Sequence, residues 1–335
     1  MKQQRFLTVV GTLLCCVLMV MPTLTSCDNL IYDDLQPCPR GFSMRFVYDY
    51  NMEYANAFPK KVDCLTLLIY DDKGNYLGKR TETTEVLADE NYRMVVDLPE
   101  GKYHVVAYGG LACEESSFIM SVPEAGLAAL QVEMQHNNLT SDKALHGLFY
   151  GAMDVTIDSE MYKDVTLYMM KDTNNIRIVL QQLSGDPVNV EDFSAYITDD
   201  NTLFAYDNSL ISQGQATYLP WAQGQRTAGI ATRDAEAGDE VKVAYYEFST
   251  SRLMIGNSPR LVIKRNDLGT DIVNIPLNSY LLLLKSDLYA DMGNQEYLDR
   301  ESEWSMVFLL DTKHAWIKTQ VIINDWIVRL NDTDF

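Results

Sequence analysis

Short segments typical of β-strands, separated by turns, recur through most of this chain and limit the folds open to it. Residues 43–50 alternate, because Met44 and every second residue after it are large and apolar or aromatic. Residues 62–70 are apolar at nearly every position, as in a strand covered on both faces, and end at the acidic turn 71–75. Comparable segments lie at 92–98, 102–108, 164–170, 175–183, 193–198, 241–248, 260–265, 271–275, 305–310 and 318–329. The sequence therefore predicts an all-β fold.

Because such strands recur in both halves of the chain, we expect two β-sandwich domains in tandem. The strand at 193–198 ends at an Asp-Asp-Asn turn, much as 62–70 ends at its own acidic turn, which favours two copies of one plan. A further turn is predicted at 171–174, between two strands of the second set. The boundary is expected between Gly151 and Lys163, which gives domains 43–158 and 159–335.

One region favours a helix, so the prediction includes one short helical insertion. Residues 280–303 are the best helix candidate in the chain, although Gly293 interrupts them. Residues 124–136 have helical spacing at Leu127, Leu130 and Met134, but they also fit one more short strand.

The N-terminus has the pattern of a bacterial lipoprotein signal. Lys2 and Arg5 precede an apolar run without charge, and residues 24–27 read Leu-Thr-Ser-Cys. A cysteine directly after a cleavage site is the residue that is acylated. We therefore expect a signal peptide at 1–26, a lipid on Cys27 and a tether at 27–42. The alternatives are a transmembrane anchor and an ordinary cleaved signal, since the run is long enough to span a bilayer.

The net charge limits the possible partners of the chain, and the cysteine content limits its disulfides. The chain holds 27 Lys and Arg against 47 Asp and Glu, for a net charge of -20. This acidity disfavours nucleic acid and anionic bilayer surfaces as partners, because both bind basic patches. Besides Cys27, three cysteines remain after the signal, Cys38, Cys64 and Cys113. At most one disulfide can join them, and the sequence leaves the pairing open.

Motifs for chemistry are scarce. The four histidines are far apart, and neither a nucleophile elbow nor a phosphate-binding loop occurs. The acidic turn at 71–75 lacks the ligand spacing of a calcium loop, and no pair of carboxylates is marked for glycoside hydrolysis. The sequence therefore predicts no enzyme activity, no metal site, no small-molecule substrate and no cofactor apart from the lipid on Cys27.

The tryptophans offer two readings. They could form a sugar-stacking face on a glycan-binding protein, or they could fill sandwich cores, which is the commoner use of large aromatic side chains. The four residues are Trp221, Trp304, Trp316 and Trp326.

Several short motifs together resemble one family, the fimbrium anchoring subunits of the Bacteroidales, which comprise the FimB-type lipoproteins and their minor-fimbria counterparts. The block at 97–108 is also similar to the strand–turn–strand of transthyretin-like sandwiches, in which the tyrosine after the turn, here Tyr103, packs inward. The family motifs are Cys27 in its lipobox, Pro-Cys-Pro at 37–39, and residues 67–71, 103–110, 295–301 and 322–329.

The resemblance implies two transthyretin-like sandwiches, attachment to the outer membrane by lipid, surface display, and a place at the base of a fimbrium built by strand exchange. Its partners would be fimbrial stalk or accessory subunits. Stalk subunits of such fimbriae lose an N-terminal strand to an arginine-specific protease, whereas anchors are expected to keep it and so end the polymer. Arg40 and Arg45 lie in that region, which leaves anchor and stalk open. A tip or adhesin subunit is the close alternative.

The last predicted strand is a candidate for strand exchange, because a terminal strand can join a neighbour's sheet without moving a following segment. Its two faces are both largely apolar, as in a strand covered on both sides, although an ordinary internal strand has the same pattern. The candidate residues are Val321, Ile322, Ile323, Asn324, Asp325, Trp326, Ile327 and Val328. Two other functions stay open: a surface glycan-binding lipoprotein and a secreted hydrolase.

Overall fold

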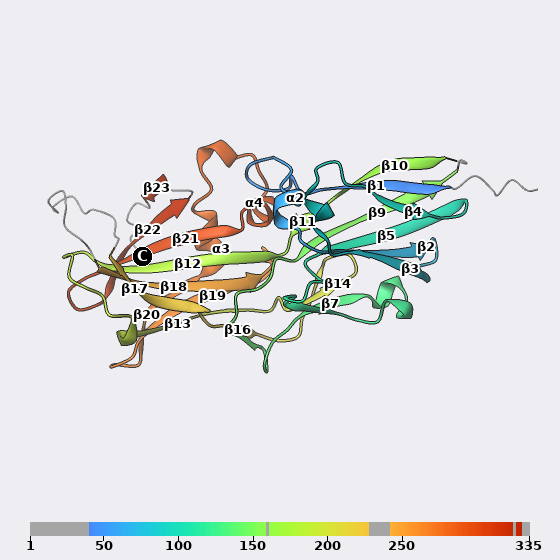
Figure 1. Ribbon diagram of the computed structural model, residues 1–335. Coiled ribbons are helices and arrows are strands. Elements are labelled where there is room, and N and C mark those ends of the chain that lie inside the picture. The colour runs from blue at the N-terminus through green and yellow to red at the C-terminus, as the bar shows by residue number, and fades with distance from the viewer. Residues whose placement is uncertain (1–39, 159–160, 228–241, 324–325, 330–335) are drawn as a thin grey trace, which may run out of the picture.

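A computed structural model describes residues 40–158, 161–227, 242–323 and 326–329. Five β-sheets and three short α-helices make up this part of the chain, so the all-β prediction is confirmed. The molecule is elongated, with two sandwiches that follow one another along its length (Figure 1). Strand β1 begins at one end, and the turns of the second sandwich lie at the other. Cys27 and the signal peptide lie outside the described residues.

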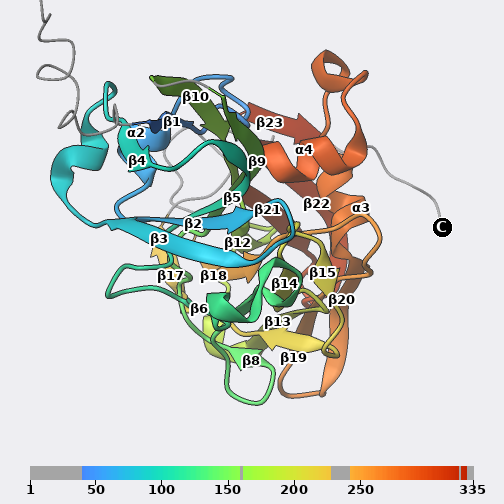
Figure 2. The same cartoon turned by 90° about the vertical axis from the view of Figure 1, so that its right-hand side faces the viewer.

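The N-terminal sandwich stacks a three-stranded sheet on a five-stranded sheet (Figure 2). The smaller sheet has the order β10 (Tyr162–Tyr168), β1 (Gly41–Val47) and β4 (Met94–Asp97). The larger has the order β11 (Met170–Lys171), β9 (Phe149–Ile157), β5 (Gly101–Gly109), β2 (Leu65–Asp71) and β3 (Tyr76–Glu82). Two short helical turns complete this half, α2 (Phe58–Lys61) and η2 (Glu85–Ala88).

Strand β2 confirms the reading of 62–70 as a strand covered on both faces. Leu65, Leu67 and Ile69 point into the core between the two sheets of the N-terminal sandwich. Leu68 and Tyr70 point the other way, into a second core that extends through the C-terminal half. Two apolar cores thus require apolar side chains at successive positions.

The C-terminal sandwich stacks a six-stranded sheet on a five-stranded sheet. The first has the order β17 (Ala222–Thr227), β18 (Lys242–Ser251), β12 (Thr173–Gln182), β21 (Glu303–Leu310), β22 (Trp316–Ile323) and β23 (Trp326–Arg329). The second has the order β20 (Thr270–Pro276), β19 (Arg260–Arg265), β13 (Phe193–Asp199), β16 (Ala216–Tyr218) and β8 (Thr140–Ser141), with η5 (Val190–Asp192) before β13.

Strands from both halves of the chain share two sheets, so the sandwiches are not independent. The fifth sheet has the order β15 (Leu210–Ile211), β14 (Leu203–Ala205), β7 (Gln131–Met134) and β6 (Phe118–Met120). Strand β8 likewise pairs with β16 of the second sandwich. In the ambiguous segment 124–136, the short 3₁₀ turns η3 (Pro123–Ala125) and η4 (Leu127–Ala129) lead into β7, so a strand is present and the long helix is not.

The chain changes sandwich at Asp172, later than the boundary that the sequence predicts at 158/159. Strand β10 pairs in parallel with β1, and β11 pairs with β9, so both stay with the N-terminal sandwich. Strand β12 then starts the six-stranded sheet. Periodicity identifies a strand but not the sheet it joins, which explains the difference.

The predicted helix at 280–303 is divided into three short pieces. They are α3 (Leu277–Leu282), η6 (Asp287–Tyr289) and α4 (Asn294–Arg300). Gly293 directly precedes α4 with extended backbone, so the glycine marks a helix start. No helix in the described residues is long and apolar enough to cross a bilayer.

The two sandwiches repeat one hairpin, although not the one expected. In the β2–β3 turn, Asp71 Oδ1 accepts hydrogen bonds from the backbone N–H groups of Lys73 and Asn75. In the β21–β22 turn, Asp311 Oδ1 accepts from Lys313 and Ala315 in the same way. Each hairpin also has a register shift next to its turn. The expected counterpart at 199–201 differs, because Asp199 is buried there.

Candidate functional site

Strand β1 is the middle strand of the three-stranded sheet. It pairs in parallel with β10 on one edge and antiparallel with β4 on the other. Phe42 and Met44 are fully buried in the N-terminal core, and Phe46 is nearly so. Removal of β1 would therefore uncover two strand edges and an apolar groove between them, the kind of site that accepts an added strand.

The N-terminal end of β1 is fixed by close contacts. Leu98 donates a backbone hydrogen bond of 2.9 Å to the carbonyl oxygen of Arg40. Gly41 lies so close to β4 that a Cβ atom there would sit 1.8 Å from the carbonyl oxygen of Val96. Arg40 lies 3.8 Å from Glu100 at this end, whereas Arg45 lies within the paired strand and its Nε is buried. Of the two candidate cleavage sites, Arg40 therefore directly precedes β1, whereas Arg45 lies within it.

The far end of β1 leads into a loop that the C-terminal half holds. The guanidinium carbon of Arg300, on α4, lies 4.2 Å from the ring centre of Tyr50 and 4.6 Å from that of Tyr54. The same side chain donates to the carbonyl oxygens of Asp49 and Asn51. A cation between two aromatic rings is attractive, and the planar guanidinium also stacks well on rings. The position of β1 is thus coupled to the second sandwich.

A buried polar cluster lies where the chain crosses between the sandwiches. The predicted turn at 171–174 is wrong: Asp172 is fully buried between β11 and β12 and donates its backbone N–H to the carbonyl oxygen of Leu148. Its Oδ1 accepts a 2.9 Å hydrogen bond from Asn208. The polar residues at 171–174 have the composition of a turn, but they lie where the chain crosses from one sandwich to the other.

Arg252, directly after β18, forms ion pairs with the carboxylates of this cluster. Its Nε and Nη2 each donate to Asp299 on α4 at 2.8 Å, in a bidentate pair. Its Nη1 donates to the carbonyl oxygen of Asn208, and its Nε lies 4.0 Å from Asp172. One guanidinium thus faces two buried carboxylates, Asp172 and Asp299, from different parts of the chain.

Burial alters the protonation of Asp172. The pKa of Asp172 is raised to about 7, chiefly by burial; Arg252 and Asn208 oppose the rise, and the negative charge of Asp299 adds to it. Burial also raises the pKa of Asp199 to about 6 and raises that of Glu301. These carboxyls bind protons in the folded state more tightly than in the unfolded state, where an aspartate has a pKa of about 3.9.

We expect the free energy of unfolding to rise as the pH falls from 8 to 5. The folded pKa of Asp172 lies above the unfolded one, so protonation between these values favours the folded state. The Asp172→Asn variant should lose a share of this rise on the order of 2 kcal/mol. Urea unfolding at pH 8 and pH 5 measures the change in the free energy of unfolding. An equal change in variant and wild type would contradict the assignment.

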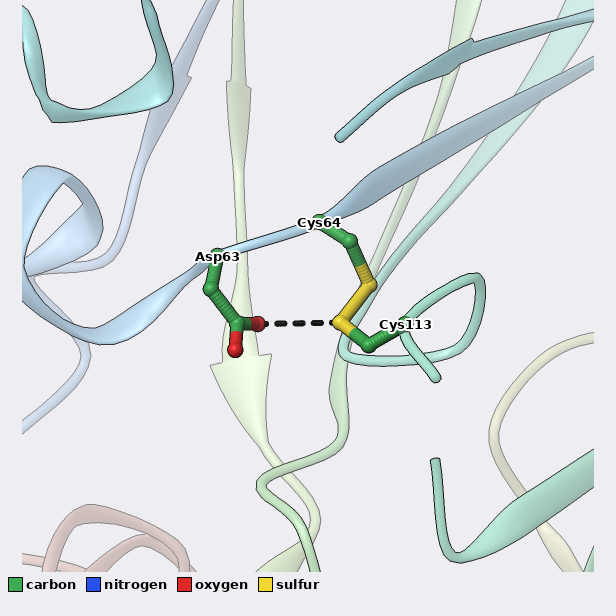
Figure 3. A group of neighbouring side chains, drawn as sticks. All are labelled: Asp63, Cys64 and Cys113. Carbon is green, nitrogen blue, oxygen red and sulfur yellow. Dashed lines mark hydrogen bonds between the residues drawn. A yellow bond between two sulfur atoms is a disulfide. The ribbon is translucent and has the colours of Figure 1, made fainter. Parts of the chain in front are cut away.

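A disulfide joins Cys64, directly before β2, to Cys113 in the loop after β5 (Figure 3). This settles the pairing left open by the sequence, although Cys38 lies outside the described residues. Asp63 Oδ1 lies 3.0 Å from Cys113 Sγ and 3.1 Å from His146 Nε2. These three neighbouring residues, Asp63, Cys64 and Cys113, are the one group of potential metal ligands in the described residues. Because the sulfurs are bonded to each other, neither offers the thiolate that a metal needs.

We expect the Cys64→Ser/Cys113→Ser variant to lose about 4 kcal/mol of stability, since the bond closes a loop with a sequence separation of 49. Thermal unfolding of the variant against wild type, with and without reductant, measures the loss. Reductant should lower the wild-type melting temperature towards that of the variant and leave the variant unchanged. A wild type that is insensitive to complete reduction would contradict the estimate.

The C-terminal candidate segment forms two strands where one was predicted. Strands β22 and β23 pair antiparallel, with Ile323 opposite Trp326, and β23 is the edge of the six-stranded sheet. The prediction of one continuous strand is therefore wrong for this segment. Asn324 and Asp325, and the side chains of the other candidate residues, lie outside the described part, so the exchange role stays a prediction.

The tryptophans lie in different settings. Trp304 is buried and donates from Nε1 to Asn174 Oδ1 at 3.0 Å, and Trp316 packs against Phe308. Trp221 is 44% exposed. The three described tryptophan side chains therefore do not gather into one stacking face. Tyr103 packs inward as expected, with its hydroxyl on the carbonyl oxygen of Pro99.

Comparison with known proteins places these features in context. A family model described as "Fimbrillin-A associated anchor proteins Mfa1 and Mfa2" matches residues 35–332. A comparison with curated proteins finds no match.

Among solved structures, a candidate adhesin from Bacteroides thetaiotaomicron is 56% identical, with a TM-score of 0.82 over 89% of this chain and 100% of that one. A candidate polysaccharide-binding protein from the same species is 29% identical, with a TM-score of 0.74 over 88% and 99%. The fimbrial anchor protein Mfa2 from Porphyromonas gingivalis shares the fold, with a TM-score of 0.64 and 14% identity over 87% and 99%. The family match covers nearly the whole chain, and this protein therefore belongs to the family of fimbrillin-A associated anchor proteins Mfa1 and Mfa2.

Proposed function

We propose that this protein is an outer-membrane lipoprotein that anchors a fimbrium and ends its polymer, with the lipid on Cys27 and the folded part displayed outside the cell. The observation that carries the proposal is the position of β1, paired on both edges and buried on one face. While β1 stays in place, the groove between β10 and β4 is filled, so no neighbouring subunit can add a strand there. A subunit of this kind ends the fimbrial polymer.

The arrangement of the molecule along its length supports an anchor. Strand β1, which follows the proposed tether, begins at one end, and the turns of the C-terminal sandwich lie at the other (Figure 1). A lipid before β1 would hold that end at the membrane. The opposite end would then face away from the cell, where a fimbrium has to attach.

The setting of the two arginines supports retention of β1. Arg40 is the only basic residue between Cys27 and Gly41, and cleavage after it would separate the lipid from an intact β1. Cleavage after Arg45 would divide the strand, but this residue is paired with Thr166 of β10. A protease needs its substrate in an accessible extended form, so Arg45 would first have to leave the sheet.

The N-terminus of the protein in assembled fimbriae tests this proposal. Mass spectrometry of fimbriae sheared from cells should find an acylated peptide that starts at Cys27. A chain that starts at Phe46 would show that most of β1 is removed, as in a stalk subunit. A chain that starts at Gly41 would show that the lipid is removed while β1 stays.

The C-terminal segment is our proposed donor for exchange with a neighbouring subunit. In support, β23 is an edge strand and can leave the sheet without displacing the strands before β22. A chain truncated after Lys318 should still reach the surface but release its fimbriae. Normal retention by a folded truncated chain would exclude this role, and its thermal unfolding shows whether it is folded.

A tip or adhesin role is the second candidate, favoured by the 56% identity to a candidate adhesin. Antibodies against this protein, coupled to gold, should label the base of fimbriae if it is an anchor and the free end if it is a tip. A glycan-binding role has weaker support, since Trp221 is the one exposed tryptophan among those described.

A further inference from the structure

The C-terminal sandwich ends in three turns that hold one another in place. We define the loop end as residues 183–192, 265–269 and 311–315, which lie at the end of the molecule away from the start of β1 (Figure 1). Asn266 donates its backbone N–H to the carbonyl oxygen of Asp192 and its side-chain amide to that of Glu191, at 2.9 and 2.8 Å. Arg265 donates to the carbonyl oxygen of Lys313 at 2.6 Å. Each of these contacts joins two different turns.

Further contacts make the loop end rigid. Arg265 also holds Asp267 in its own turn through two contacts of 2.8 Å. The rings of Phe193 and His314 meet edge to face, with centres 5.4 Å apart. Gln182 donates to the carbonyl oxygen of Asp311 at 3.1 Å. Loops fixed in this way lose little conformational entropy when a partner binds.

The side chains presented by this surface are unusual for turns. Leu268 occupies the turn between β19 and β20 and is 64% exposed, and Leu183, directly after β12, is 47% exposed. Turn positions ordinarily carry Gly, Asn, Asp or Ser, and neither leucine belongs to a described core cluster. Stability of the fold therefore does not account for them.

The charge around the leucines indicates the kind of partner. The loop end carries five acidic residues against two basic ones, Arg265 and Lys313. Arg265 is already engaged with Asp267 and Lys313. The acidic residues are Asp186, Glu191, Asp192, Asp267 and Asp311. Exposed leucines on a surface with an excess of acidic residues match apolar pockets edged with lysine or arginine.

We propose that the loop end is the surface on which this protein receives the fimbrial subunit it holds, and that the facing surface of that subunit carries apolar pockets with a basic rim. The inference rests on the proposed function and adds to it the site of contact. Loops on a rigid sandwich commonly provide such contacts. The leucines supply apolar burial, and the acidic groups favour encounter with a basic surface.

The test uses the full-length chain expressed in cells that lack the native gene, with fimbriae measured on cells and in the medium. The Leu183→Ser/Leu268→Ser variant should release several-fold more fimbriae than wild type. The matched control is Leu283→Ser/Leu288→Ser, because these leucines are also exposed, 53% and 82%, but lie after α3 and in η6. The control should retain fimbriae as wild type does. Surface amount and melting temperature should be the same for both.

A second variant keeps the test decisive if the leucine variant folds poorly. Asp186→Asn/Glu191→Gln should weaken retention and reduce the effect of a high-salt wash, because it removes charges from the same surface. Retention equal to wild type in a folded loop-end variant would overturn the inference. So would normal retention combined with lost adhesion to host surfaces, which would make the loop end a receptor face. If cells without the gene keep their fimbriae, the proposed function itself fails.

Discussion

Deletion of residues 40–48 is expected to prevent the N-terminal sandwich from folding, and a peptide of the same sequence is expected to restore the fold when added in trans. Strand β1 supplies Phe42, Met44 and Phe46 to the core, each worth about 1.5–3 kcal/mol when buried. Its loss also leaves β10 and β4 without their shared partner. These losses together rival the total stability of an ordinary domain, about 5–15 kcal/mol.

Restoration by the peptide separates a specific groove from general damage. Two control peptides are matched to the structure. One replaces Phe42, Met44 and Phe46 by serine and removes the apolar contacts. The other carries Gly41→Ala and places a methyl group against the carbonyl oxygen of Val96. Circular dichroism and thermal unfolding measure the restored fraction. If the chain that lacks residues 40–48 folds without any peptide, this result would contradict the role given to β1.

The Arg252→Met variant should lose about 3–5 kcal/mol of stability, because Asp172 and Asp299 would stay buried without a cation. Methionine keeps much of the length and apolar contact of the side chain, so the loss reports the charge. The control is Arg177→Met, whose ion pair with Glu247 is half exposed on the arginine side. It should change stability by less than about 1 kcal/mol.

Two further variants complete the experiment, Asp299→Asn alone and Asp299→Asn combined with Arg252→Met. The combined variant should recover part of the loss, since it removes the carboxylate that forms the bidentate pair with Arg252. Urea unfolding of wild type, the two single variants and the double variant provides the free energies for a double-mutant cycle, which gives the coupling between Arg252 and Asp299. If Arg252→Met unfolds at the same urea concentration as Arg177→Met, the cluster at the crossing does not join the sandwiches as described.

Local features of the sequence predicted local structure well. The alternation at 43–50 and the continuous apolar run at 62–70 matched β1 and β2, because each pattern follows from burial on one face or both. The acidic residue at the end of β2 formed the expected turn, since its carboxylate caps the backbone of that turn. The inward position of Tyr103 followed from the similarity of residues 97–108 to transthyretin-like sandwiches.

Contacts between distant parts of the chain could not be predicted in the same way. Asp172 and Arg252 lie far apart in the sequence, and neither has a local pattern that separates a buried ion pair from a polar turn. Strands β7 and β8 pair with the later strands β14 and β16, and no periodic signal in the sequence indicates this pairing. The motif at 295–301 was the one available signal for the crossing, because it contains Asp299 and Arg300.

The Cys27→Ala variant tests the central claim most directly, because it removes the proposed lipid and leaves the described fold untouched. The measurement is the fraction of fimbriae in the medium, with the variant chain quantified in membrane and soluble fractions. We expect the variant to leave the membrane fraction or remain as an uncleaved precursor, and fimbriae to appear in the medium. Normal membrane attachment of a processed chain, with fimbriae held on the cells as in wild type, would contradict the account.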